Sequence, residues 1–322
     1  MFFGSLRDNP VEYVAFPDRD FLSFKRLKIK KENHMNRFRD SVVVITGASS
    51  GIGRSLALEF SRFGANLALC DINDDGLQET RDLLEENSSQ GKVSLHKVDV
   101  SDRDEYLTFV EEVKQIHGRV NVIVNNAGVS LVDRAEAIQK ESFEWLMGIN
   151  FWGVVYGSQL FLPLLKGQSV AHIVNISSIF GIVSFPLQSA YNASKFAVKG
   201  FTESLAIELK DSGVQVHCVH PGAIKTNIVR SARVVELSGY AKDQNEMVSN
   251  FDRMAKVTPL QAAQTIIEGM LKGKSRILIG RDAKMLDVYQ RLFPSKYKTL
   301  VPKLVNLGRK ALASKNREVL NT

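Results

Sequence analysis

A tyrosine and a lysine four residues apart, Tyr191 and Lys195, carry the most informative chemistry in this chain. On a helix this spacing places both side chains on one face, one turn apart. A free tyrosine ionises at a pH of about 10, too high for a base near neutrality, and a neighbouring ammonium favours its phenolate form. A serine, Ser178, stands thirteen residues before Tyr191, at the end of an apolar run. A tyrosine that exchanges a proton beside a serine that hydrogen-bonds a substrate oxygen suits acid–base chemistry on an alcohol or ketone.

The run VVVITGASSGIG over residues 42–53 combines a strand, a glycine-rich turn and the start of a helix. Its β-branched residues predict a buried strand, and the residues after Gly53 have helical periodicity. Free backbone N–H groups and the positive end of the helix dipole then meet at one point, which suits a pyrophosphate. The glycine spacing, Gly47-x-x-x-Gly51-x-Gly53, differs from the G-x-G-x-x-G of many dinucleotide sites. We nevertheless predict that this stretch binds the phosphates of a nucleotide cofactor.

An aspartate, Asp71, follows the second predicted strand, eighteen residues after Gly53. Dinucleotide sites place an acidic residue about 20 residues after the glycines, where it binds the ribose 2′-hydroxyl. A carboxylate there repels a 2′-phosphate, so the sequence predicts that NAD is preferred over NADP. The nearby cation of Arg54 argues for NADP, and capping of the following helix by Asp71 or Asn73 is the alternative reading of this stretch.

These stretches resemble the short-chain dehydrogenase/reductase family, and the resemblance covers about residues 40–280. It rests on TGASSGIG at residues 46–53, NNAG at residues 125–128, and Ser178 followed by YNASK at residues 191–195, in the order typical of the family. A proline-glycine pair, Pro221-Gly222, after the sixth predicted strand also matches. The resemblance implies an oxidoreductase that transfers a hydride between a nicotinamide cofactor and a secondary alcohol or ketone.

The family pattern implies a role for each polar residue of the site. Tyr191 takes up or gives the proton of the alcohol, and Ser178 stabilises the charge on the substrate oxygen. Lys195 lowers the pKa of Tyr191 and holds the nicotinamide ribose. Asn150 bends its helix and completes a proton relay to solvent. The predicted cofactor contacts are Gly47, Ser49, Ser50, Gly51, Ile52, Gly53, Asp71, Asp99, Val100, Asn126, Ala127, Gly128, Tyr191, Lys195, Pro221, Gly222, Ile224 and Thr226.

Apolar runs alternate with helical patterns from residue 41 to residue 280. The predicted strands are 42–46, 66–70, 93–97, 120–124, 171–176, 214–219 and 276–279. The predicted helices are 51–63, 75–87, 102–117, 136–166, 188–211 and 259–271. The alternation predicts the α/β class, with a single doubly wound Rossmann-type domain whose mostly parallel seven-stranded sheet is flanked by helices. Ligands of such folds bind beyond the carboxyl ends of the strands.

Charge is unevenly distributed along the chain, which has a formal net charge of +7. Residues 41–271 carry a net charge of −6, whereas residues 1–40 carry +3 and residues 272–322 carry +10. We therefore expect an N-terminal extension (1–40), a catalytic domain (41–280) with a lid at about 227–257, and a basic amphipathic C-terminal tail (281–322). The tail predicts peripheral contact with an anionic surface, a membrane rather than nucleic acid, or else a solvated helix face.

Composition and motifs argue against several other classes of protein. The sequence contains no run of about 18 apolar residues, so no membrane-spanning helix is expected. The first residues lack the pattern of a secretory signal. The two cysteines, Cys70 and Cys218, are too few for a disulfide framework and indicate a reducing, cytoplasmic compartment. The six histidines have no metal-ligand spacing, so no metal site is predicted, and the absence of a G-x-S-x-G elbow disfavours a hydrolase.

The predicted site is surrounded by apolar residues, namely Leu131, Val132, Ile179, Phe180, Ile182, Val183, Phe185 and Pro186. They favour a lipophilic substrate of steroid, retinoid or fatty type, and packing on the core is the alternative reading. The family resemblance implies a homodimer or homotetramer paired through long helices. A non-catalytic dinucleotide-binding regulator of the same fold is the alternative function, although a regulator does not require the Ser-Tyr-Lys set.

Overall fold

The computed structural model describes residues 36–299, apart from residues 88, 90, 236 and 238–240. Its centre is a parallel sheet of seven strands in the order β3-β2-β1-β4-β6-β7-β9. The strands are β1 (Val42–Thr46), β2 (Asn66–Asp71), β3 (Val93–Lys97), β4 (Val122–Asn125), β6 (His172–Ile176), β7 (Gln215–Pro221) and β9 (Arg276–Ile279). The strand order reverses between β1 and β4, so the crevice for a ligand lies beyond their carboxyl ends.

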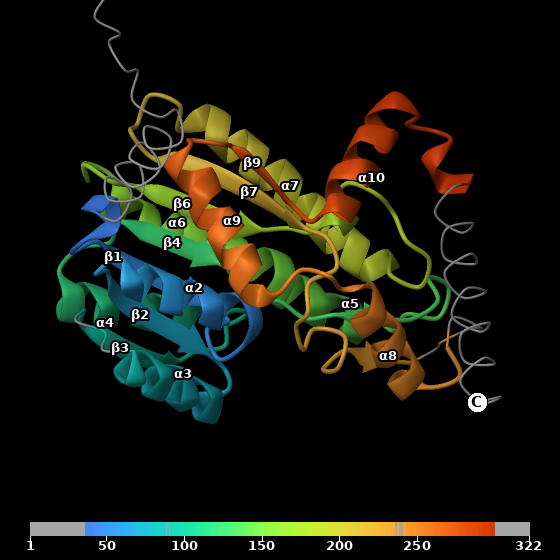
Figure 1. Cartoon of the computed structure of the whole chain (residues 1–322), viewed down its shortest axis with the longest axis horizontal. Helices are drawn as coiled ribbons and strands as arrows, with labels where there is room; N and C mark the ends of the chain where they lie inside the picture. The colour runs from blue at the N-terminus through green and yellow to red at the C-terminus, as the bar shows by residue number, and fades with distance from the viewer. Residues whose placement is uncertain (1–35, 88, 90, 236, 238–240, 300–322) are drawn as a thin grey trace, which may run out of the picture.

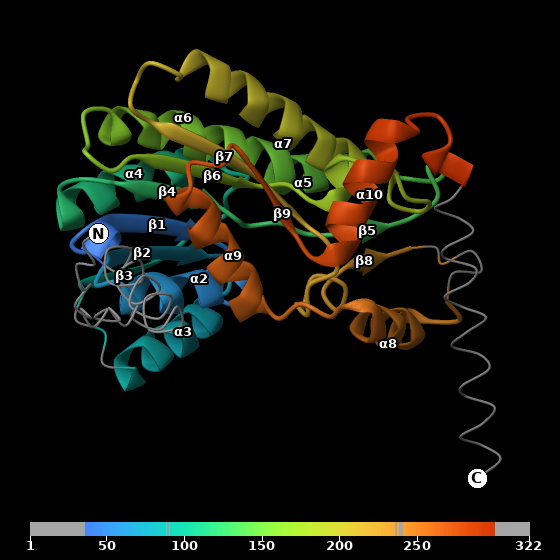
Figure 2. The same ribbon diagram turned by 45° about the horizontal axis from the view of Figure 1, so that its top comes forward.

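Helices cover both faces of this sheet (Figures 1 and 2). One layer contains α2 (Gly51–Arg62), α3 (Asp74–Glu86) and α9 (Pro259–Leu271), and the other contains α4 (Arg103–His117), α6 (Gly153–Leu165) and α7 (Ser189–Glu208). Successive strand residues point to opposite faces, so Val43 packs in the first core while Val42 and Val44 pack in the second. The α/β class and the seven-stranded parallel sheet predicted from the sequence are confirmed.

Each of the seven predicted strands is present within two residues of its expected ends, but the helix predicted over 136–166 is wrong at its start. Backbone N–H groups of Ala137 and Ile138 donate to the Arg134 carbonyl and close a turn there. Gln139 is extended, so the helix begins only at α5 (Lys140–Met147). A π turn, η2 (Gly148–Trp152), then joins α5 to α6. Turns of this kind inside helices occur frequently at functional sites.

The segment predicted as a lid, residues 227–257, contains β8 (Arg233–Val234) and α8 (Gln244–Met254). Strand β8 pairs with β5 (Leu131–Val132) in a small second sheet. The guanidinium of Arg233 lies 3.5 Å from the ring centroid of Trp145 in α5. At the end of the segment, the carbonyl of Val257 accepts a hydrogen bond from the backbone N–H of Lys225 (3.0 Å). The described part of the segment is therefore attached to the domain at several points.

Helix α10 (Arg281–Leu292) lies within the segment predicted as a tail, and it packs on the domain. Ala283 and Tyr297 are buried in a cluster with Ile179, Ile182 and Val183, around the short helix η3 (Ile179–Gly181). Figure 1 shows α8 and α10 beyond the carboxyl ends of the strands. Most of the predicted N-terminal extension, and the part of the predicted basic tail after residue 299, lie outside the described residues. None of the described helices combines the length and the hydrophobicity that a transmembrane span requires.

Candidate active site

A cavity of about 710 Å³ lies at the carboxyl ends of the central strands. It extends from the glycine-rich turn after β1, past Asp71 and the NNAG stretch, to Ser178 and Tyr191. All of the predicted cofactor residues line it except Gly53. Gly53 lies beneath the turn, where a Cβ atom would overlap the carbonyl of Gly47. The fold thus brings together motifs that are far apart in the sequence.

The glycine-rich turn is tightly packed against the NNAG stretch. Gly47 has a φ of +67°, and a Cβ atom there would lie 2.8 Å from the backbone of Ala127. The hydroxyl of Thr46 accepts hydrogen bonds from the backbone N–H groups of Asn126 (2.9 Å) and Ala127 (3.0 Å). Ser50, the N-cap residue of α2, makes no side-chain capping hydrogen bond. A helix N-terminus without a side-chain cap at the wall of a cavity fits a bound pyrophosphate.

The first asparagine of NNAG stabilises the sheet beneath the cavity. Asn125 is buried and its side chain donates to Asn175 of β6 (2.7 Å) and to Ser158 of α6 (3.2 Å). Asn175 in turn donates to Thr202 of α7 (3.0 Å). Buried polar groups are tolerated when they are hydrogen-bonded to one another, and here they join two strands to two helices.

Asp71 lies at the end of β2, on the cavity wall. Its carboxylate accepts hydrogen bonds from the backbone N–H groups of Ser49 and Asn73, both at 3.0 Å. Asn73, rather than Asp71, caps α3. The nearby cation, Arg54, contacts Glu79 of α3 (2.8 Å), and it does not line the cavity.

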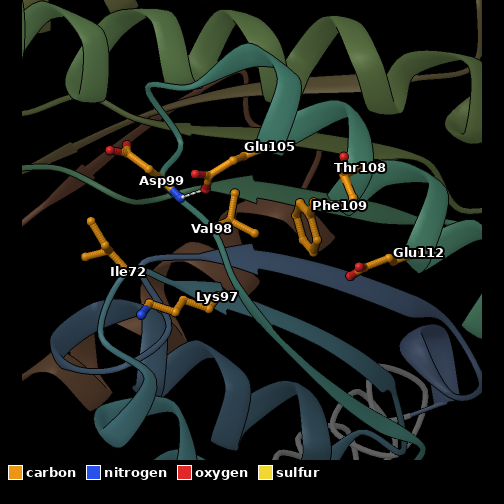
Figure 3. A pocket seen from close by; sticks show the side chains of 8 residues that line it. All are labelled: Ile72, Lys97, Val98, Asp99, Glu105, Thr108, Phe109 and Glu112. Carbon is orange, nitrogen blue, oxygen red and sulfur yellow. Dashed lines mark hydrogen bonds between the residues drawn. The ribbon is translucent and has the colours of Figure 1, made fainter.

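A second, smaller pocket of about 540 Å³ adjoins the cavity beside β3 and α4 (Figure 3). The two share Ile72, Val98 and Asp99. Figure 3 shows the backbone N–H of Asp99 donating to the Glu105 carboxylate, at 2.8 Å. The Asp99 carboxylate accepts from the backbone N–H (2.9 Å) and hydroxyl (2.7 Å) of Ser101. Asp99 is thereby held at the end of the cavity nearest Asp71.

Tyr191 and Ser178 lie at the other end of the cavity, on α7 and directly after β6. Burial raises the pKa of Tyr191 to about 12, and a hydrogen bond between its side chain and that of Ser178 lowers it in part. The neighbouring Ser177 is engaged elsewhere, because its hydroxyl donates to the Lys195 carbonyl at 2.8 Å. Strand alternation predicts that the two serines point in opposite directions, which leaves the Ser178 hydroxyl beside Tyr191.

Lys195 lies one helical turn after Tyr191, and its ammonium is 5.7 Å from the tyrosine ring centroid. The ammonium donates to the Ile176 carbonyl (3.0 Å), and burial lowers the pKa of Lys195 to about 8. Asn150 is fully buried in the π turn, and its side chain exchanges hydrogen bonds with the backbone of Val129 (2.8 and 3.0 Å). A Cβ atom on Gly128 would lie 3.2 Å from the Asn150 carbonyl oxygen and 3.4 Å from the Lys195 nitrogen. Glycine at this position keeps the space between the two side chains open.

Asp282, the second residue of α10, lines the same cavity and is absent from the site residues predicted from the sequence. Its carboxylate accepts from the backbone N–H of Ala223 at 2.8 Å and covers Gly222, where a Cβ atom would overlap it. Pro221, Ile224 and Thr226 of the same loop also line the cavity. A detectable signal was the glycine before α10, Gly280, whose φ of +97° allows the turn that brings Asp282 over the loop.

The substrate side of the cavity is apolar. Of the predicted apolar residues, Leu131 and Ile182 are buried in the core and do not line it, whereas Val132, Ile179, Phe180, Val183, Phe185 and Pro186 do. The lid segment and α10 add residues that the sequence analysis did not identify, namely Ile228, Val229, Leu237, Met247, Phe251, Met254 and Leu286. The arrangement can hold an extended apolar ligand with its polar group near Tyr191.

Comparison with known proteins gives a consistent result. Residues 41–236 match the short chain dehydrogenase family. The chain is 42% identical over 270 residues to the Mycobacterium tuberculosis protein SadH, covering 83% of this chain and 96% of SadH. It resembles a short-chain dehydrogenase/reductase from Burkholderia phymatum solved with NAD (TM-score 0.72, 27% identity, 80% of this chain and 94% of that one). It also resembles a Thermococcus sibiricus alcohol dehydrogenase solved with 5-hydroxy-NADP (TM-score 0.63, 25% identity, 74% of this chain and 95% of that one). The chain belongs to the short-chain dehydrogenase/reductase family of NAD(P)-dependent oxidoreductases.

Proposed function

We propose that this enzyme transfers a hydride between NAD and a lipophilic secondary alcohol or ketone. The observation that carries the proposal is one cavity with a phosphate-binding turn at one end and Ser178 and Tyr191 at the other. The bound nicotinamide supplies the hydride acceptor or donor. The residues of the chain position the substrate and move its proton.

Tyr191 acts as the general acid–base, because its side chain is hydrogen-bonded to that of Ser178 and lines the cavity. Ser178 donates to the substrate oxygen and stabilises the charge that develops on it. Lys195 favours the phenolate form through its charge and contacts the ribose. Asn150, behind Gly128, connects this group of side chains to solvent through a held water.

A preference for NAD follows from the charges near the second strand. The carboxylate of Asp71 would repel a 2′-phosphate. Arg54 cannot offset that repulsion from its present position, because it is held against α3 by Glu79. Its guanidinium also donates to the hydroxyl of Thr80 at 3.0 Å.

The decisive experiment measures NADH formation from NAD, with NADP in parallel, over a panel of steroid, retinoid and aliphatic alcohols. Turnover that requires NAD and is lost in Tyr191→Phe supports the proposal and identifies the substrate class. Cofactor binding without turnover of any panel member favours the regulator instead. Faster turnover with NADP would contradict the role given to Asp71.

We further propose a homodimer or homotetramer. Large apolar residues are exposed on the outer side of the π turn and of α7, where Trp152, Phe196 and Ile207 are 47%, 40% and 77% exposed. Such residues are typical of a surface that is covered in an assembly. Light scattering after size exclusion measures the mass, and a monomer at micromolar concentration would contradict this proposal.

Peripheral membrane contact is proposed for the basic C-terminal segment. Both acidic residues of α10 point inward, since Asp282 binds Ala223 and Asp287 is 4% exposed. The outward face therefore carries Lys284 and apolar residues such as Met285, which is 57% exposed. Cosedimentation with anionic vesicles tests this contact, and binding that survives deletion of residues 295–322 and Lys284→Glu would argue against it.

A further inference from the structure

Two buried nitrogen atoms near the active site have no hydrogen-bond partner in the described part of the chain: Nε2 of His220 and Nε of Arg276. Buried polar atoms without partners are rare, and many such atoms bind an ordered water molecule. His220 is fully buried at the end of β7, directly before the Pro221-Gly222 pair. Arg276 begins β9, and its side chain is 25% exposed.

The register of the sheet places both side chains on the same face. Cys218 pairs with Arg276, and His220 pairs with Leu278, so all four point to one side. That side faces α10, because Leu278 packs in the cluster around Ala283 and η3. The opposite side is identified by Val219 and Ile277 of the same two strands, which pack in the core beneath α2 and α9.

The two orphaned atoms are chemically complementary. The Nδ1 atom of His220 lies 3.0 Å from the Ser178 carbonyl, an acceptor, so Nδ1 carries the hydrogen. In the neutral ring Nε2 is then a free acceptor, and burial favours the neutral ring. The Nε atom of Arg276 is always a donor. A donor and an acceptor left unpaired on one face of two adjacent strands suit a single bridging water.

The far ends of both side chains are anchored. Arg276 forms an ion pair through Nη2 with Asp287 of α10, whose side chain is 6% exposed. His220 donates to the carbonyl of Ser178. We propose that one buried water joins Arg276 Nε to His220 Nε2, so that α10 positions Ser178 through a continuous chain from Asp287. His220 and Arg276 are positioning residues in this chain, because they act through Ser178 and do not touch the substrate.

The effect of this hydrogen-bonded series on turnover rests on the proposed function, but the presence of the water does not. A crystal structure of the wild type should therefore show density for one water about 2.7–3.2 Å from both atoms. Arg276→Lys keeps a cation for Asp287 but lacks the Nε–H group. His220→Asn keeps a donor for the Ser178 carbonyl but has no acceptor at the position of Nε2. The water should be lost from both variants. Density that shows a direct Arg276–His220 contact, or an empty space, would overturn the proposal.

Kinetics and melting curves test the coupling. A small displacement of a catalytic group can cost up to about 100-fold in rate, and we expect about tenfold in kcat for each variant, with the KM for NAD within twofold. The double variant should be no slower than the worse single variant, and the two losses of melting temperature should also be non-additive. Arg291→Gln is the matched control, because Arg291 pairs with the same Asp287 (3.4 Å) from a 58% exposed position. If the losses of kcat in the two single variants add up in the double variant, the hydrogen-bonded connection from Asp287 to Ser178 is refuted. Turnover that survives Tyr191→Phe would refute the proposed function alone.

Discussion

The charge of Lys195 offers the most direct test of what favours the phenolate form of Tyr191. In the structure burial dominates and raises that pKa to about 12. The ammonium of Lys195 lies 5.7 Å from the ring centroid. At an effective dielectric constant of about 20, two unit charges at that distance attract each other by about 3 kcal/mol. This corresponds to about 2 pKa units of phenolate stabilisation.

Lys195→Met keeps the length of the side chain and removes its charge. The acidic limb of the pH profile of kcat/KM for alcohol oxidation, measured at saturating NAD, should therefore move up by about 2 units. The ammonium supplies this effect only while it is protonated, and burial lowers the pKa of Lys195 to about 8. The difference between wild type and variant should thus be largest below pH 8. An acidic limb that stays at the wild-type position would refute the electrostatic role of Lys195.

Three further predictions concern the cofactor, acid stability and the lid. Asp71→Ser should raise kcat/KM for NADP relative to NAD at least tenfold, because the repelling carboxylate is gone; an unchanged ratio would contradict its role. Burial lowers the pKa of His172 from 6.5 to about 3. Because the unfolded chain then binds the proton more tightly than the folded chain, the free energy of unfolding falls as the pH drops below about 6.5. This histidine alone should cost about 2 kcal/mol at pH 5, and urea titrations at pH 7.5 and 5 that give the same unfolding free energy would count against it. Arg233→Ala removes the cation–π contact with Trp145, which contributes about 0.5–2 kcal/mol. The KM for the alcohol should rise several-fold, and a binding titration should show unchanged affinity for NAD.

The parts of the fold that the sequence predicts are those in which short-range patterns and packing agree. The β-branched run before Gly47 must be a buried strand, and its neighbours repeat the same pattern at regular intervals. Asn125 and Asn126 follow such a strand, so the sequence also indicates which edge of the sheet they occupy. The structure adds what they bind, the side chain of Asn175 and the backbone of Thr46 and Gly47.

The parts that the sequence does not predict depend on contacts between distant residues. The π turn at Asn150 has the composition of an ordinary helix, and its geometry is accompanied by two hydrogen bonds to the backbone of Val129. Similarly, Asp282 reads as an acidic residue in the first turn of a helix, which is a common position. Its contact with Ala223 joins residues 59 positions apart.

The contrast between short-range patterns and distant contacts also explains why family membership defines the cofactor chemistry but not the substrate. The family match ends at residue 236, and every predicted cofactor contact lies before that point. The apolar lining of the cavity is completed by residues that follow, including Leu237, Phe251 and Leu286. These residues come from the lid segment and from α10, and α10 is also the helix whose Asp287 holds Arg276. Substitutions in α10 should therefore alter both the choice of substrate and the position of Ser178, whereas substitutions around Gly47 should alter cofactor binding alone.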